Sequence, residues 1–235
     1  MKTVCMNLKD QLLASKIYLV LAALFITSLV VSNLIFQKFF YWNPFGWFPF
    51  EISAGLLPYP VTFLITDIIS EIYGKKKANQ IVITGIFASF FSVLIVLVGN
   101  YTTATSWSPV NNDVYTQVFG FSTIAVLASM LAYLFAQFID IRVFHFWKRK
   151  TNGNHLWLRN NFSTFTSQFI DTFTVVSLLC LFEVLSWDVF SSVLLSGFLF
   201  KIIVAALDTP ILYIAVCFFR KRFLLGKGEE LKGIL

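Results

Sequence analysis

Long apolar segments interrupted by ionisable side chains dominate this sequence. A helix needs about 20 mainly apolar residues to cross the hydrocarbon core of a bilayer, and such segments follow one another along the 235-residue chain. Only 13% of the residues are charged, against about 25% in an average soluble domain. The sequence therefore predicts an all-α integral membrane protein, a bundle of six transmembrane helices in one domain over residues 1–235. The expected spans are about 16–39, 56–73, 78–101, 120–147, 162–186 and 191–219.

The basic residues predict the orientation of these spans. With six crossings and a cytoplasmic N-terminus, 15 of the 18 Lys and Arg residues fall on the cytoplasmic side, from Lys2 near the start to Lys232 near the end. The long external loop at about 102–119 contains none. Basic residues resist translocation, so an N-in/C-in topology is expected. This placement also explains the net charge of +6 without a nucleic-acid partner.

The first apolar run could be mistaken for a signal peptide because three lysines precede it. The run is too long for that purpose, and no small-residue cleavage site follows it. We expect a retained helix. The next segment, 41–60, carries four prolines and two glycines among many aromatic residues. It predicts either a short hairpin or re-entrant turn at the external mouth, or an aromatic loop in the headgroups, with Glu51 a weak site candidate.

Ionisable and amide side chains inside the predicted spans are the site candidates. A charge at the centre of a membrane helix costs roughly 3 kcal/mol on insertion scales, so such groups should face a polar cavity in the bundle. The expected substrate-binding residues are Asn33, Asp67, Glu71, Gln137, Asp140, Gln168, Asp171 and Lys201. Gating or structural support is expected from Arg159, Asn160, Asn161 and Asp208.

Two groups of these candidate residues, on neighbouring predicted helices, share a short sequence pattern. Residues 136–140 read AQFID and residues 167–171 read SQFID, so each copy places an amide and a carboxylate on one face of a helix. The two copies lie on consecutive helices of opposite direction, as in inverted-topology repeats. Chance in a chain rich in Phe and Ile remains the alternative.

Each candidate also has a purely structural interpretation. Amides and carboxylates can join helices by hydrogen bonds without touching a ligand. Glu71 could pair with Lys75, Asp140 with Arg142 or Arg159, and Lys201 with Asp208 or Asp171. The three cysteines and two histidines form no metal-binding pattern, so neither a metal nor a cofactor is expected. The sequence also lacks HExxH and GxSxG motifs, which argues against a membrane-embedded hydrolase.

Several stretches closely resemble the queuosine precursor transporter family, in matching order through all six spans. They are SNLIFQK (32–38), PYPVTFLITDIISEIYGKKKA (58–78), LAYLFAQFIDIRVFHFWKRKTNG (131–153), LWLRNNFSTFTSQFIDT (156–172) and FKIIVAALDTPILY (200–213).

The resemblance implies a bacterial inner-membrane importer of 7-cyano-7-deazaguanine, 7-aminomethyl-7-deazaguanine or queuine, precursors of queuosine in tRNA. It also implies a six-helix bundle similar to the capture subunits of energy-coupling-factor importers. A carboxylate can accept two neighbouring N–H groups of such a base, and aromatic side chains can stack on its faces. Two other functions stay open, a capture subunit that needs an ATP-driven partner and a transporter of another planar heterocycle or vitamin. Proton coupling, facilitated diffusion and a homodimer also stay open.

Overall fold

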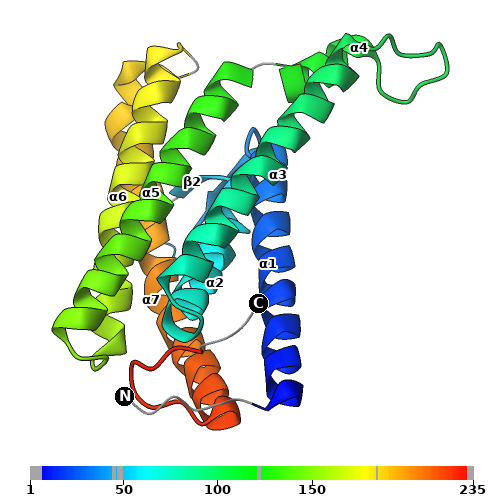
Figure 1. Cartoon of the computed structure of the whole chain (residues 1–235). Coiled ribbons are helices and arrows are strands. Elements are labelled where there is room, and N and C mark those ends of the chain that lie inside the picture. The colour runs from blue at the N-terminus through cyan, green and yellow to red at the C-terminus, as the bar shows by residue number, and fades with distance from the viewer. Residues whose placement is uncertain (1–6, 44–45, 47–49, 121–122, 184, 232–235) are drawn as a thin grey trace.

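The computed structural model describes residues 7–43, 46, 50–120, 123–183 and 185–231, so Lys2 and Lys232 lie outside the described part. Helices make up most of the molecule (Figure 1). The long helices are α1 (Leu8–Ile35), α2 (Tyr59–Ile72), α3 (Lys75–Tyr101), α5 (Thr123–Lys150), α6 (Leu156–Leu181) and α7 (Phe190–Phe223). The short elements are β1 (Phe39–Trp42), β2 (Phe50–Ser53), η1 (Ala54–Leu56), α4 (Asn112–Tyr115), η2 (Thr116–Gly120) and η3 (Trp187–Val189).

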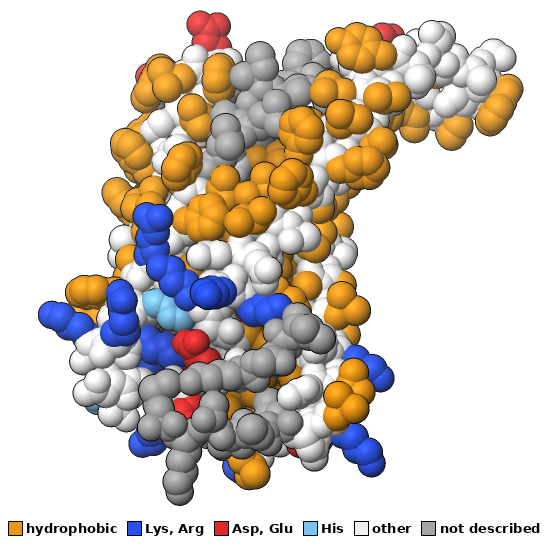
Figure 2. Space-filling view, viewed as in Figure 1, with side chains coloured by type: hydrophobic (Ala, Val, Ile, Leu, Met, Phe, Trp, Pro, Cys, Tyr) orange, Lys and Arg blue, Asp and Glu red, His pale blue; other side chains and the backbone are white. Residues whose placement is uncertain are grey.

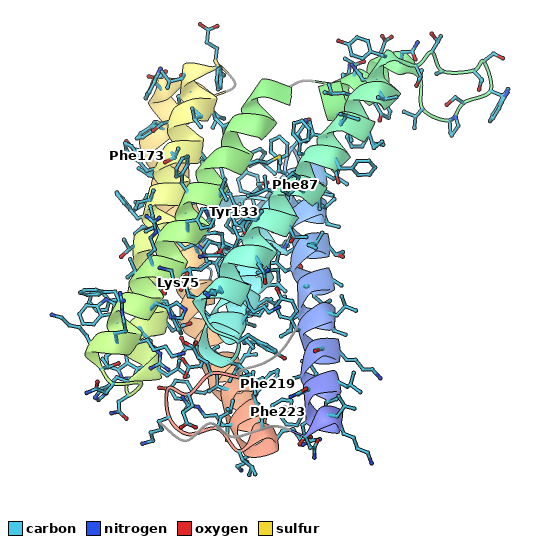
Figure 3. The ribbon with its side chains drawn as sticks, viewed as in Figure 1. Lys75, Phe87, Tyr133, Phe173, Phe219 and Phe223 are labelled. Atoms are coloured by element: carbon cyan, nitrogen blue, oxygen red, sulfur yellow. The ribbon has the colours of Figure 1, made fainter. Side chains whose placement is uncertain are left out.

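Five helical segments of the described chain are long and apolar enough to cross a membrane, which makes this a multi-pass all-α membrane protein. They are α1, η1 with α2, α3, α6, and η3 with α7. Their outer faces are apolar, and Phe87 on α3 and Phe173 on α6 point away from the bundle (Figure 3). The 28-residue α5 is not among these five. A count of six crossings and the N-in/C-in orientation therefore stay predictions.

Helix ends differ from the expected spans because hydropathy marks only the part of a helix that lipid surrounds. The first helix begins at Leu8 instead of residue 16, and the Asn7 side chain caps it by accepting a 2.8 Å hydrogen bond from the Asp10 amide. It ends at Ile35, before the expected 39, because Phe39 already belongs to β1. Similarly, α6 begins at Leu156 instead of residue 162.

The start of α1 and the end of α7 lie at one end of the bundle. Arg222 near the end of α7 pairs with Asp10 at the start of α1 at 2.9 Å. Figure 1 shows the start of α1 and the end of α7 there, at the lower end in that view, and Figure 2 shows Lys and Arg side chains gathered over the same part of the visible face. We call this the terminal end of the bundle and the opposite one the distal end. The distribution agrees with a cytoplasmic terminal end.

The segment after α1 forms a β-hairpin that packs on the bundle, as the first of the two predicted alternatives has it. Strands β1 and β2 pair antiparallel, with Tyr41 opposite Glu51. Ile52 is fully buried and packs in one cluster with Phe50 and Phe200 of α7. Figure 1 shows the hairpin among the helices. The apolar face of β2 therefore anchors the hairpin to α7.

Close approach to α1 allows this non-helical backbone to sit in the bundle. Irregular backbone is tolerated at membrane depth only where protein or a cavity satisfies its polar groups. Here the Ser32 hydroxyl donates a 2.5 Å hydrogen bond to the Gly55 carbonyl, and the Ser53 hydroxyl donates to the Phe36 carbonyl. A Cβ at Gly55 would lie 2.6 Å from the Ser32 carbonyl oxygen, so only glycine fits at this contact.

Candidate functional site

Four helices bring their ionisable side chains together in three layers along the bundle axis. From the distal to the terminal layer the residue numbers rise along α2, α5 and α7 and fall along α6, so α6 runs opposite to the other three helices. The distal layer contains Tyr59, Tyr133, Asp171 and Lys201. The middle layer contains Asp67, Asp140, Ser167 and Asp208. The terminal layer contains Glu71, Lys148, Arg159 and Arg220.

The distal layer consists of an ion pair that an aromatic side chain contacts. Lys201 Nζ lies 2.6 Å from Asp171 Oδ2, and the Tyr59 hydroxyl donates a 2.7 Å hydrogen bond to the same oxygen. The Lys201 ammonium also lies 4.6 Å from the centre of the Tyr59 ring. Both charged side chains are buried, so each relies on the other to offset the loss of solvation.

A cavity of about 160 Å³ opens on the distal side of this layer. A cavity of about 150 Å³ is known to hold a benzene-sized molecule, so this one suits a small planar ligand. Apolar side chains from α6 and α7 form much of its wall, and polar groups enter it from α1, the hairpin, α2, α5, α6 and α7. We call it the distal cavity. Its polar lining residues are Ser32, Asn33, Glu51, Ser53, Tyr59, Tyr133, Asp171, Thr172 and Lys201.

Two lining residues of the distal cavity keep buried polar atoms that find no partner among the described residues. They are the second carboxylate oxygen of Asp171, Oδ1, and the amide nitrogen of Asn33, Nδ2. A buried polar group without a hydrogen bond is costly, so both atoms are available to a ligand. Together they offer one acceptor and one donor.

Tyr133 is placed in the distal cavity by a chain of hydrogen bonds inside the bundle. The Gln137 side chain donates a 2.7 Å bond to the Tyr133 hydroxyl and accepts a 3.3 Å bond from Thr66. The Tyr133 ring packs edge-on against Tyr59, with ring centres 4.9 Å apart. Figure 3 shows Tyr133 between the helices. Gln137 thus acts on the cavity through Tyr133.

The middle layer brings two carboxyl groups near one another. Asp67 of α2 and Asp140 of α5 interact electrostatically, and Ser167 of α6 donates a 3.0 Å hydrogen bond to Asp140. Beside them lies a second, water-sized cavity of about 20 Å³. We call it the middle cavity. Its polar lining residues are Tyr59, Asp67, Asn160, Thr164, Gln168, Lys201 and Asp208.

The terminal layer is an ion cluster around one fully buried carboxylate. Glu71 contacts Arg159 at 2.6 Å, Arg220 at 2.5 Å and Lys148 at 3.5 Å. Lys148 also binds Glu230 at 2.9 Å. The cluster therefore ties α2, α5, α6, α7 and the C-terminal segment together at the terminal end.

The predicted site residues divide between these environments. Asn33, Asp171 and Lys201 line the distal cavity, whereas Asp67, Asn160, Gln168 and Asp208 line the middle one with Lys201. Glu71, Gln137, Asp140, Arg159 and Asn161 line neither cavity. Asn161 instead bonds the Trp157 carbonyl at 2.8 Å. The expectation of one cavity shared by all these groups is therefore corrected, because the distal layer separates two cavities.

Several structural pairings also replace the expected ones. Glu71 pairs with the terminal-layer cations instead of Lys75. Asp140 bonds Ser167 instead of an arginine. Of the two partners considered for Lys201, the structure selects Asp171. The matched facets 136–140 and 167–171 also differ in depth, since Asp140 lies in the middle layer and Asp171 in the distal layer.

Sequence reasoning did not select Tyr59 and Tyr133, and it ranked Glu51 low. The chain contains many aromatic residues, so nothing in the sequence distinguishes these two tyrosines from the ones that face lipid. The signal that could have found Tyr133 is its spacing of four residues from Gln137, which places both side chains on one helix face. Glu51 could have been found by strand alternation in the hairpin.

Two comparisons with known proteins find relatives of this chain. Residues 53–215 match the family described as "Putative vitamin uptake transporter". A Bacillus subtilis (strain 168) protein named "Probable queuosine precursor transporter" is 31% identical over 166 residues, which cover 69% of this chain and 71% of that protein. No solved structure matches the chain.

Proposed function

The chain belongs to the vitamin uptake transporter family, and on that premise we propose that it imports a queuosine precursor across a bacterial inner membrane. The substrate would be 7-cyano-7-deazaguanine, 7-aminomethyl-7-deazaguanine or queuine, and the chain itself would carry out transport without an enzymatic step. The observation that carries the proposal is the distal cavity, which combines apolar walls with the unpartnered Asp171 Oδ1 and Asn33 Nδ2. The name of the Bacillus subtilis relative supports the substrate class.

The chemistry of a deazaguanine fits this cavity. Its ring N–H and exocyclic amino groups are donors, and Asp171 Oδ1 is a buried acceptor. Its carbonyl oxygen accepts, and Asn33 Nδ2 is a donor. The flat ring would lie between apolar side chains and the two tyrosines of the distal layer, where aromatic stacking contributes about 1–3 kcal/mol per base in nucleic-acid binding proteins.

The distal layer is a barrier in the proposed pathway. Tyr59 and Lys201 line both cavities, so a substrate moving from the distal to the middle cavity must pass them. A ligand that binds Asp171 competes with the two bonds that hold Tyr59 and Lys201 in place. Binding would therefore loosen the barrier, and alternating access would follow from movement of α2 and α7 around the site.

Uptake of labelled precursors by cells expressing the chain, in a host without its own synthesis or uptake, tests the proposal. We expect saturable uptake that unlabelled deazaguanines abolish and that purines, biotin and riboflavin leave unchanged. Asp171→Asn should lower uptake at least tenfold, since a buried hydrogen bond to a charged group is worth about 1.5–3 kcal/mol. Asp113→Asn is the matched control, because Asp113 is exposed on α4. Competition by riboflavin or biotin instead would overturn the substrate class.

Reconstitution of the purified chain in liposomes tests whether it transports alone. We expect uptake without ATP or a second protein, because one chain supplies both cavities and the barrier between them. Uptake that appears only after addition of an ATPase partner would identify a capture subunit. An imposed pH gradient in the same liposomes distinguishes proton coupling from facilitated diffusion. A homodimer would contain two such pathways.

A further inference from the structure

We propose that Glu51 on the hairpin is the counter-ion for a positively charged amine on the substrate, so that the distal cavity prefers 7-aminomethyl-7-deazaguanine over the neutral 7-cyano compound. This inference rests on the proposed function and names the member of the substrate class. Three observations carry it: the face of the hairpin that lines the cavity, the charges of that lining, and the absence of an ion pair at Glu51 within the described structure.

The two faces of the hairpin serve different purposes. Side chains alternate between the faces of a strand. Phe50 and Ile52 belong to the buried cluster with Phe200, whereas Glu51 and Ser53 line the distal cavity. Phe39, paired with Ser53 across the hairpin, lines the cavity as well. The packing of β2 against α7 therefore holds Glu51 at the cavity wall.

The lining of the distal cavity carries a net negative charge because of Glu51. Its charged residues are Glu51, Asp171 and Lys201. Asp171 and Lys201 neutralise one another at 2.6 Å. No described Lys, Arg or His lies within ion-pair distance of Glu51. The nearest basic residue in the sequence, Lys38, directly precedes β1, and strand alternation places it on the opposite face of the hairpin. Glu51 is thus the uncompensated charge of the cavity.

Asp171 and Glu51 lie at different places in the cavity, so each can bind a different part of the substrate. Asp171 is buried next to the barrier, whereas Glu51 is exposed at the hairpin side of the same cavity. The shared ring donors of the substrate class suit the buried acceptor. An aliphatic amine is protonated at neutral pH, as in lysine, and a protonated amine forms the stronger, charge-assisted hydrogen bond with a carboxylate. A nitrile has no donor and gains nothing from Glu51.

The test compares uptake of the two labelled compounds by the full chain and by Glu51→Gln, which keeps the size of the side chain and removes its charge. We expect the wild-type chain to have the lower KM for the aminomethyl compound. In Glu51→Gln this KM should rise about tenfold, equivalent to about 1.4 kcal/mol, while the KM for the cyano compound stays within about twofold. Glu51→Asp should retain most of the preference, and Glu51→Lys should lower aminomethyl uptake further. Asp113→Asn is again the control for an exposed carboxylate.

The outcomes separate this inference from the proposed function. Equal KM values for both compounds in the wild-type chain would overturn the inference and leave the import of deazaguanines intact. An equal loss of both activities in Glu51→Gln, with the protein monodisperse in detergent, would overturn it too, because Glu51 would then bind the part that the compounds share. Uptake of neither compound by the wild-type chain would refute the proposed function itself.

Discussion

Asp171 and Lys201 form a 2.6 Å ion pair between adjacent helices, and both residues line the cavity in which we place the substrate. The pair is buried and yet incomplete, since Asp171 Oδ1 has no partner among the described residues. A purely structural ion pair would be expected to satisfy its remaining lone pairs. In the proposed function the pair joins α6 to α7, and the open acceptor binds the substrate.

Charge removal at this pair separates its two roles. Lys201→Met leaves the Asp171 carboxylate buried without a counter-ion, so we expect a loss of about 3–5 kcal/mol in stability. The double variant Lys201→Met/Asp171→Asn should recover most of that loss and still fail to take up substrate. Thermal unfolding in detergent and uptake in liposomes measure the two properties. Normal uptake by the double variant would show that the pair is structural only.

Gly197 offers a way to fill the distal cavity without disturbing the helices. It lines that cavity, and a Cβ there would meet only the Thr172 methyl group, at 3.4 Å. Gly197→Ala should therefore stabilise α7 by about 0.5–1 kcal/mol and keep uptake. Gly197→Leu would extend into the cavity, so uptake should fall below detection while the unfolding temperature changes little. Unimpaired uptake by Gly197→Leu would place the substrate elsewhere.

Glu71 is expected to matter for stability and not for substrate affinity. It is fully buried and contacts three cations of the terminal layer. Glu71→Gln removes their shared counter-charge, so we expect a loss of about 3–5 kcal/mol and lower amounts of folded protein. The KM of the remaining folded protein should be unchanged. Glu229→Gln is the control, because among the described residues the Glu229 side chain bonds locally, to the Gly226 amide. A raised KM in Glu71→Gln would return Glu71 to the substrate site.

A substitution at Gly55 tests the close packing of the hairpin against α1. A Cβ at this position would lie 2.6 Å from the Ser32 carbonyl oxygen and 2.8 Å from the Phe36 Cβ. Gly55→Ala must push the hairpin away from α1, at a cost of about 1–3 kcal/mol typical of overpacking. Because the hairpin carries Glu51, the KM for substrate should also rise. Ser53→Ala, which removes the hydrogen bond to the Phe36 carbonyl at the end of α1, should have a smaller effect on both.

Much of the site could be predicted because the cost of charge in a membrane selects few residues. Asp171, Lys201, Asp67 and Gln168 were selected in this way, and all four line cavities. Burial alone does not reveal what faces a buried group. The same argument therefore also selected Glu71 and Gln137, which the structure surrounds with protein partners.

The sequence by itself determined the membrane class, the apolar helices and the depth of each polar side chain, since these follow from hydropathy and from the constant rise of a helix. Only the tertiary structure decided which groups of similar depth meet. Rotation of the helices about their axes pairs Lys201 with Asp171 and Asp67 with Asp140. The packing of Phe50 and Ile52 against Phe200 likewise places Glu51 at the distal cavity. Such contacts depend on the fit of whole helix surfaces, which no local pattern in the chain encodes.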